Sequence, residues 1–159
     1  MPPRFLLPVL SLLVLAACGG DRGQPASGEP PAAAAPAAAD GLTPFEVTHG
    51  IGPIKEEIPA APVQHELAEK GEKVFEEKCS ACHKLGERYV GPPLGDVTQR
   101  RSLAYVMNMI LNPEEMYMKH PEAKKLLAEY LTQMPNQGLS QEDARAVVEY
   151  LREEGSGAK

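Results

Sequence analysis

Five consecutive residues carry the clearest chemical signal in this chain: Cys79, Ser80, Ala81, Cys82 and His83. The Cys-x-x-Cys-His spacing is typical of covalent haem attachment, in which two thiols reach the two vinyl groups of the ring. A turn brings residues three and four apart to one side of the backbone, so the imidazole that follows can reach the iron. We therefore predict one covalent haem c, bound through Cys79 and Cys82, with His83 as an axial ligand of the iron.

Two other sites share the Cys-x-x-Cys spacing. A zinc site needs two further ligands at suitable spacing, and no second Cys-x-x-Cys or His pair lies nearby in the sequence. A thioredoxin-like redox pair needs a βαβ pattern, which the surrounding sequence lacks. The His that follows at once and the export signal described next both favour haem.

The N-terminus has the pattern of an export signal. Arg4 is followed by an apolar stretch from Phe5 to Ala17 and then by Cys18. The stretch contains Pro8 and is too short to cross a hydrocarbon core of about 30 Å as a helix. Leu15-Ala16-Ala17-Cys18 resembles the lipobox of bacterial lipoproteins, although an ordinary signal peptide with an incidental Cys stays possible. We predict cleavage after residue 17 and lipidation of Cys18.

The three cysteines then all have a role, since Cys18 takes the lipid and Cys79 and Cys82 take the haem. Removal of residues 1–17 takes away Arg4, and the formal net charge goes from −6 to −7. A nucleic-acid partner is excluded, because phosphate binding needs a basic face. We expect a lipid-anchored protein on the periplasmic side of a bacterial membrane.

Residues 18–40 are predicted to be the lipidated Cys and a disordered tether, because prolines alternate with alanine and glycine and little could form a core. Residues 41–64 contain several Ile, Val and Phe residues, yet their prolines and glycines exclude a long helix or a regular strand pair. We predict an irregular arm against the folded domain here, with more linker as the alternative. His49 and His65 are predicted at the surface.

Residues 65–155 are predicted to form an all-α haem domain, because apolar residues recur at helical spacing and no stretch alternates with period two. Haem would supply the apolar core that so short a domain lacks. Asn112-Pro113-Glu114-Glu115 is typical of a helix start with a capping box, Pro121 starts a helix through Leu131, and Ser140 with Asp143 starts the last helix. Gly155 is predicted to close it.

The second axial position decides between an electron carrier and a reactive haem site. Five methionines follow the motif: Met107, Met109, Met116, Met118 and Met134. The first four fall in or beside predicted helices, where a flexible thioether fills gaps. Met134 is followed by Pro135 in a loop between two helices and can project at the iron. Thioethers also bind cuprous copper, so a copper site of the four helical methionines with His120 is a third hypothesis.

The predicted haem domain, residues 65–155, resembles the small monohaem cytochromes c of the class I type over its whole length. The resemblance rests on Gly71 and Phe75, Cys79, Cys82 and His83, Gly91-Pro92-Pro93-Leu94, Met134-Pro135, and a Leu-Ser start to a last helix that carries Tyr150. It implies a small cytochrome c fold of four to five helices around the haem.

The resemblance also implies roles for single residues. Gly71 would let the first and last helices cross closely, with Phe75 and Tyr150 packed at the crossing. The Pro92 carbonyl would accept a hydrogen bond from His83 Nδ1 and orient the ring. Met134 would be the sixth iron ligand. A further likeness, to periplasmic cytochromes that serve respiratory reductases or oxidases, covers Arg100-Arg101-Ser102-Leu103 to Asn112-Pro113. Arg100 and Arg101 either pair with haem propionates or form a solvated pair at a helix start.

Imidazole and thioether together leave no position for a substrate. The expected function is one-electron transfer between respiratory-chain components and a terminal reductase or oxidase, by a monomer that docks transiently on redox partners and is not an enzyme. The alternative is a five-coordinate haem protein that binds gas or peroxide, which requires that Met134 be off the iron.

Overall fold

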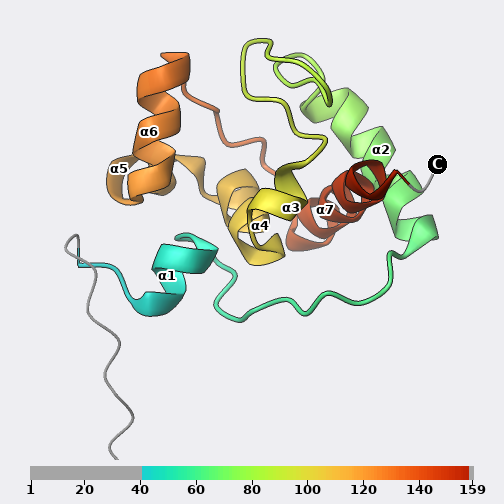
Figure 1. The fold of residues 1–159 in the computed structure, drawn as a ribbon, viewed down its shortest axis with the longest axis horizontal. Coiled ribbons are helices and arrows are strands. Elements are labelled where there is room, and N and C mark those ends of the chain that lie inside the picture. Colours follow the sequence, from blue (N-terminus) through green and yellow to red (C-terminus); the bar gives the residue numbers. More distant parts are fainter. Residues whose placement is uncertain (1–40, 158–159) are drawn as a thin grey trace, which may run out of the picture. The chain divides into compact units, whose positions relative to one another are not determined.

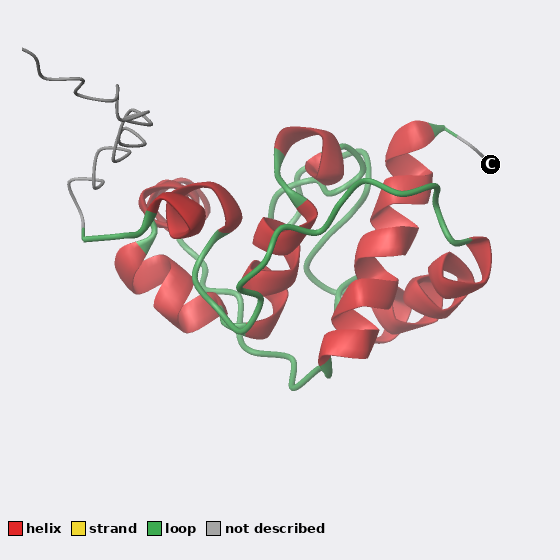
Figure 2. Cartoon of the chain, turned by 90° about the horizontal axis from the view of Figure 1, so that it is seen from below, coloured by secondary structure: helices red, strands yellow, loops and turns green. Residues whose placement is uncertain are grey.

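Several helices in this chain begin at a hydroxyl side chain that accepts from a backbone N–H, or at a proline, which has no N–H to leave unpaired. The computed structural model describes residues 41–157. These residues form seven helices and no strand (Figures 1 and 2). The all-α prediction is therefore confirmed. The helices are α1 (Pro44–His49), α2 (His65–Lys78), α3 (Val97–Arg100), α4 (Leu103–Leu111), α5 (Pro113–Lys119), α6 (Pro121–Tyr130) and α7 (Gln141–Ser156).

Two short helices, α1 and α3, raise the number above the predicted four or five. Helix α1 has six residues and begins with a complete capping box. The Thr43 hydroxyl accepts from the Glu46 N–H at 3.2 Å, and the Glu46 carboxylate accepts from the Thr43 N–H at 3.0 Å. Pro44 lies at the first helical position, where its missing N–H costs nothing. The prolines of this segment therefore exclude a long helix but permit a short one.

The first and last helices of the haem domain, α2 and α7, make the most extensive helix contact in the described region (Figure 1). A Cβ atom on Gly71 would lie 2.0 Å from the carbonyl oxygen of Ala146, so only glycine allows the helices to approach this closely. The rings of Phe75 and Tyr150 lie at the same crossing, with centroids 5.3 Å apart and planes tilted by 53°. Both expectations from the resemblance are confirmed.

The main apolar core lies where α2, α4 and α7 meet. Its buried members are Phe75, Cys79, Leu103, Val106, Met107, Ile110, Ala144, Val147, Val148, Tyr150 and Leu151. A second cluster joins the N-terminal segment to α4, α5 and α6, and its buried members are Leu42, Ile51, Tyr105, Met116 and Ala123. Helix α4 therefore contributes to both clusters.

Residues 41–64, which we call the N-terminal arm, are bound to α4 mainly through Asn108. Its side chain is fully buried. The Asn108 amide oxygen accepts from the Ile54 N–H at 2.9 Å, and its Nδ2 donates to the carbonyls of His49 and Ile54, each at 3.0 Å. A buried carboxamide needs such partners, because unpaired it would cost about 1–3 kcal/mol. The N-terminal arm, which includes helix α1, thus lies against α4.

The two histidines predicted at the surface differ. The side chain of His65 is 72% exposed, although its Nδ1 lies 2.6 Å from Glu153 Oε1. His49 is only 9% exposed, and its Nδ1 lies 2.9 Å from the hydroxyl of Ser102. The prediction for His49 is wrong, because helix α1 turns this side chain toward the start of α4.

Helix α7 starts as predicted and ends later. The Ser140 hydroxyl accepts from the Asp143 N–H at 3.0 Å. The helix continues through Gly155 to Ser156, and Gly157 is the C-cap residue with φ of 66°. Gly155 has another function, since a Cβ there would lie 2.7 Å from the Gly95 carbonyl oxygen. The second glycine, not the first, adopts the left-handed conformation that closes a helix.

The start of α5 and the end of α6 also differ from the helix boundaries predicted from the sequence. Pro113 is at the first position of α5 as predicted, but the Asn112 side chain does not cap the helix. Its Nδ2 instead donates to the Ile51 carbonyl of the arm at 3.1 Å and to the Glu115 carboxylate at 2.8 Å. Helix α6 ends at Tyr130, and Leu131 follows as a left-handed C-cap residue with φ of 54° and 84% exposure.

Candidate haem site

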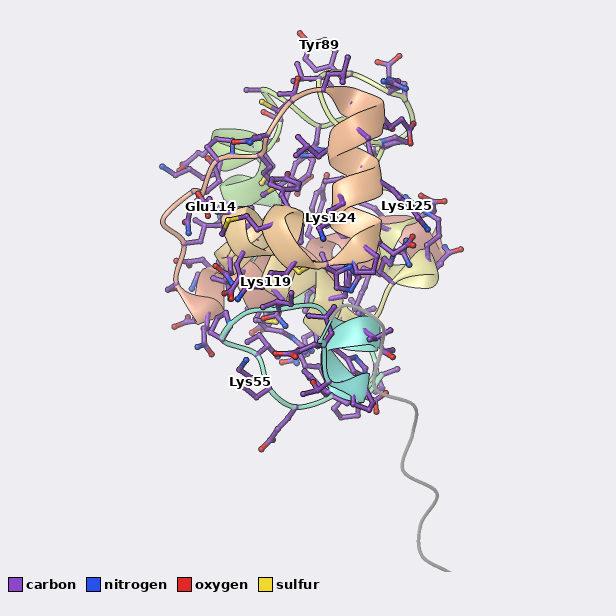
Figure 3. All side chains as sticks on the ribbon, turned by 90° about the vertical axis from the view of Figure 1, so that its left-hand side faces the viewer. Lys55, Tyr89, Glu114, Lys119, Lys124 and Lys125 are labelled. Carbon is purple, nitrogen blue, oxygen red and sulfur yellow. The ribbon has the colours of Figure 1, made fainter. Side chains whose placement is uncertain are left out.

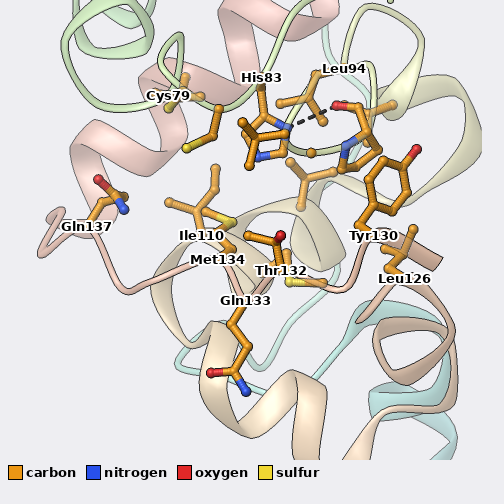
Figure 4. A pocket seen from close by; sticks show the side chains of 18 of the residues that line it. Cys79, His83, Leu94, Ile110, Leu126, Tyr130, Thr132, Gln133, Met134 and Gln137 are labelled. Atoms are coloured by element: carbon orange, nitrogen blue, oxygen red, sulfur yellow. Dashed lines mark hydrogen bonds between the residues drawn. The ribbon is translucent and has the colours of Figure 1, made fainter. Parts of the chain in front are cut away.

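The Cys-x-x-Cys-His segment forms a tight turn at the end of α2. Cys79 is the C-cap residue of the helix, and its N–H donates to the Phe75 carbonyl. The N–H groups of Cys82 and His83 both donate to the Cys79 carbonyl, at 3.0 and 2.9 Å. This turn brings all three residues to the lining of the same cavity, and Figure 4 shows the Cys79 and His83 side chains on its upper side. The arrangement suits attachment of one ring through two thiols.

His83 is oriented by a backbone carbonyl. Its Nδ1 lies 2.9 Å from the carbonyl oxygen of Pro92. A carbonyl can only accept, so Nδ1 carries the proton and Nε2 keeps its lone pair in the neutral ring. Burial lowers the pKa of His83, while the hydrogen bond to Pro92 opposes this shift. The ring is therefore held neutral with Nε2 available to a metal, and the contact implied by the resemblance is present.

Gly91 allows the loop to lie against this ring. A Cβ atom at Gly91 would lie 2.4 Å from Cε1 of His83 and 2.8 Å from Nδ1. The Gly91 N–H donates to the Cys82 carbonyl at 2.8 Å, which ties the loop to the motif. The Gly-Pro pair thus does more than form a rigid turn, because it places an acceptor beside the imidazole.

The Cys79 thiol does not have the property of a redox-active nucleophile. Cys79 is buried, and burial, with a smaller contribution from Cys82, raises its pKa to about 11. A thioredoxin-like nucleophile needs a lowered pKa. Among residues 41–157, no group of three or more His, Cys, Asp or Glu side chains is placed to hold a metal ion. Both alternatives to haem therefore lack support in the described part of the chain.

The cavity has the chemistry of a haem pocket. The space in it, together with the open solvent at its mouth, is about 1260 Å³. Its walls are mostly apolar and include Val90, Leu94, Val97, Val106, Ile110, Leu126, Leu127, Val147 and Leu151. An apolar cavity with two thiols and a neutral imidazole on one wall fits haem c.

Met134 lines the same cavity as His83. It lies in the loop between α6 and α7, and Figure 4 shows His83 and Met134 coming from different sides of the cavity. The Met134 N–H donates to the hydroxyl of Tyr117 at 2.9 Å. Met109 of α4 also lines the cavity. The structure therefore brings two thioethers to the site, one on a loop and one on a helix.

The methionines of the copper hypothesis do not converge. Met107 is buried in the main core, Met116 is buried in the second cluster, and Met118 is exposed. His120 is buried, with Nε2 at 3.2 Å from the Val47 carbonyl and Nδ1 accepting from the Glu122 N–H. Both ring nitrogens are thus engaged by the protein, and these residues serve packing.

Arg100 and Arg101 both line the cavity, and each already has a carboxylate partner. Arg100 lies 2.9 Å from Asp96, and Arg101 lies 2.7 Å from Glu122. The Arg101 guanidinium also stacks over the ring of Tyr105, 5.3 Å from its centroid. Contact with haem propionates stays a prediction from the sequence for both residues.

Tyr105 is a cavity residue that the sequence did not single out, because it falls within an apolar helical stretch. Its ring is buried, and its hydroxyl has no hydrogen-bond partner within the described structure. Burial raises the pKa of Tyr105 to about 12, so the hydroxyl is protonated and can donate. A buried hydroxyl normally has an acceptor, so this one could donate to a polar group of a bound ligand in the cavity.

Comparison with known proteins agrees with this geometry. The family model described as cytochrome c matches residues 68–154, more than half of the chain. A cytochrome c-553-like protein of Synechocystis sp. is 29% identical over 69 residues, 40% of this chain and 66%, or just under two thirds, of that protein.

Two solved structures extend the comparison. A cytochrome c from Rhodothermus marinus is 44% identical, with a TM-score of 0.67 over 72% of this chain and 98% of that chain. An engineered cytochrome c from the same organism, bound to a carbene intermediate, is 43% identical, with a TM-score of 0.64 over 71% of this chain and 98% of that one. The motif geometry and these matches show that the chain belongs to the cytochrome c family, whose members hold a covalent c-type haem.

Proposed function

We propose that this protein is a one-electron carrier whose haem iron is bound by His83 and Met134. The observation that supports this most is that both side chains line one apolar cavity, His83 with a free Nε2 and Met134 from a loop. With both axial positions taken, no position is left for a substrate, which argues against an enzyme or a five-coordinate gas or peroxide binder.

Each residue of the haem site would have its own role. Cys79 and Cys82 would hold the ring by thioether bonds at the end of α2, and the Pro92 carbonyl orients His83. Met134 would be the second iron ligand, and a thioether ligand raises the reduction potential. The apolar walls of the cavity would keep water from the ring. The haem itself supplies reversible one-electron exchange when bound.

The proposal includes a membrane tether. Residues 1–40, with the cleavage site, Cys18 and the tether, lie outside the described residues, so their roles remain predictions from the sequence. No helix within residues 41–157 has the length and apolarity to cross a bilayer. Lipidation of Cys18 would hold the haem domain on the periplasmic side of a bacterial membrane. Its partners would be a respiratory donor and a terminal reductase or oxidase, met by a monomer through small transient interfaces.

The ligand set is tested by expression with a cytochrome maturation system. Mass spectrometry should find one covalently added haem, and the ferric spectrum should show a thioether–iron band. Met134→Ala should abolish that band, lower the potential and open the iron to carbon monoxide and imidazole. Met109→Leu is the matched control, because Met109 lines the same cavity from a helix. A band lost in Met109→Leu and kept in Met134→Ala would reassign the ligand.

The tether has a separate test. Cells that express the full chain are fed a labelled fatty acid and then fractionated. Label in the membrane fraction that disappears in Cys18→Ser, with the haem protein released to the periplasm, supports the anchor. An unlabelled wild-type protein in the soluble periplasmic fraction would leave Cys18 as an incidental residue of an ordinary signal peptide.

A further inference from the structure

The loop that carries Met134 has little support from its own backbone. From residue 132 to residue 139 the described chain forms no backbone–backbone hydrogen bond. Most of these residues are exposed. Asn136 and Gln137 add hydrogen bonds within the loop, to Gly138 and Pro135. Such bonds shape a turn but do not fix its position relative to the rest of the protein.

Three hydrogen bonds attach this loop to the end of α4 and to α5. The Met134 N–H donates to the Tyr117 hydroxyl at 2.9 Å. The Asn136 N–H donates to the Glu114 carboxylate at 3.3 Å, and Asn136 Nδ2 donates to the Leu111 carbonyl at 3.1 Å. The hydrogen bond to the Tyr117 hydroxyl is the shortest of the three, and its donor is the backbone N–H of Met134 itself.

Tyr117 lies on a helix that is itself fixed to the N-terminal arm. It lies on α5, is half-buried and lines the same cavity as Met134. Its neighbour Met116 is fully buried, and the Met116 thioether accepts from the Ile51 N–H of the N-terminal arm at 3.0 Å. Asn112, at the start of α5, donates to the Ile51 carbonyl. Helix α5 is thus fixed on one side to the arm and on the other to the loop.

We propose that Tyr117 is a positioning residue for Met134. Its hydroxyl holds the Met134 peptide so that the thioether stays directed into the haem cavity, and without that bond the loop opens more often. The proposal rests on the proposed function, since it presupposes that Met134 binds the iron. It adds that the stability of this ligation is controlled from α5, a helix outside the Cys-x-x-Cys-His motif.

The test compares three variants of the haem-loaded protein: Tyr117→Phe, Tyr130→Phe and Met134→Ala. Phenylalanine keeps the ring of Tyr117 and removes only the oxygen that accepts from Met134. Tyr130 also lines the cavity, and its ring stacks under Arg88, but it makes no hydrogen bond to the loop among those of the described structure. It is therefore the matched control for the loss of a phenol oxygen at this site.

The readout is the affinity of the ferric protein for added imidazole, which competes with Met134 for the iron. The apparent affinity follows the fraction of molecules with the loop open. Loss of one hydrogen bond should raise that fraction about 2- to 10-fold, so imidazole should bind Tyr117→Phe tighter by that factor. Tyr130→Phe should bind as wild type, and Met134→Ala should set the upper limit.

Other results would contradict either the role of Tyr117 or the proposed ligation by Met134. If Met134→Ala binds imidazole tightly and Tyr117→Phe binds as wild type, Tyr117 does not position the ligand, although the proposed function stands. The same conclusion follows if Tyr117→Phe only lowers the melting temperature. If Met134→Ala keeps the wild-type spectrum and affinity, Met134 is not a ligand and both proposals fail. If Tyr117→Phe yields no haem protein, Asn136→Ala, which removes the bond to Leu111, must weaken Met134 ligation in the same assay, and failure to do so overturns the proposal.

Discussion

Gly71 of α2 lies directly against the carbonyl of Ala146 in α7, so closely that a Cβ atom would be 2.0 Å from that oxygen. The obstacle is backbone, which cannot rotate away as a flexible side chain would. Phe75 and Tyr150 pack beside this contact. The crossing therefore sets the spacing between the helix that ends in the haem motif and the last helix of the domain.

Gly71→Ala should destabilise the protein, because the two helices must separate to admit one methyl group. Overpacking of this kind costs roughly 1–3 kcal/mol, and we expect the upper end here. Thermal or denaturant unfolding of the haem-loaded protein measures the effect. Gly86→Ala is the control, since a Cβ there meets nothing within 4 Å. Equal stability of the two variants would show that the crossing tolerates side chains.

Gly91→Ala should disturb the ligation of His83, since the added methyl would lie 2.4 Å from the imidazole. We expect a lower yield of haem-loaded protein and a changed spectrum. Pro92→Ala should be milder, because the acceptor for His83 is the backbone carbonyl, which that substitution keeps. Absorption spectra per mole of purified protein compare the two. A Pro92→Ala variant more damaged than Gly91→Ala would contradict this reading of the loop.

Tyr105→Phe tests whether the buried Tyr105 hydroxyl has a hydrogen-bond partner in the haem-loaded protein. If the hydroxyl donates to an ionised haem propionate, its removal should cost about 1.5–3 kcal/mol of stability. It should also raise the pKa of that propionate, so the inflection in a plot of potential against pH moves to higher pH. Melting curves and redox titrations over a range of pH provide the measurements. A variant more stable than wild type would show that the hydroxyl has no partner in the haem protein either.

The contact of His65 with Glu153 predicts a small pH dependence of stability. The hydrogen bond and charge of Glu153 raise the pKa of His65 above its usual 6.5. A raised pKa in the folded state gives stability that is fully present below the unfolded pKa and is lost as the pH rises through the folded value. The effect should be small and weakened by salt, because the His65 side chain is 72% exposed. His65→Gln should remove this dependence, which is checked by comparing melting temperatures below and above the pKa of His65.

Much of this fold could be predicted from the sequence because its signals are local. The Cys-x-x-Cys-His turn, the Ser140 cap and the helical spacing of apolar residues all lie within one or two turns of chain. The capping box that starts α1 is equally local, but the surrounding prolines and glycines obscured it.

The remaining features depend on contacts between distant residues. The amide oxygen of Asn108 meets Ile54, and the hydroxyl of Tyr117 meets Met134, across gaps that no periodicity describes. Gly155 also has no local signal for its true role, because its close approach to Gly95 exists only in the folded chain. In the sequence Tyr105 is one more residue of an apolar helix, and only the fold shows that its hydroxyl is buried with no partner among residues 41–157.

The attachment of the N-terminal arm to Asn108 decides where this protein can be shortened. A fragment designed from the helical haem domain alone would start near residue 65 and leave the Asn108 carboxamide, the Asn112 amide and the Met116 thioether without the arm groups that they bind. It would also open the apolar faces that Leu42 and Ile51 cover. Truncations for crystallisation or fusion should therefore keep the N-terminal arm from residue 41 together with the haem domain.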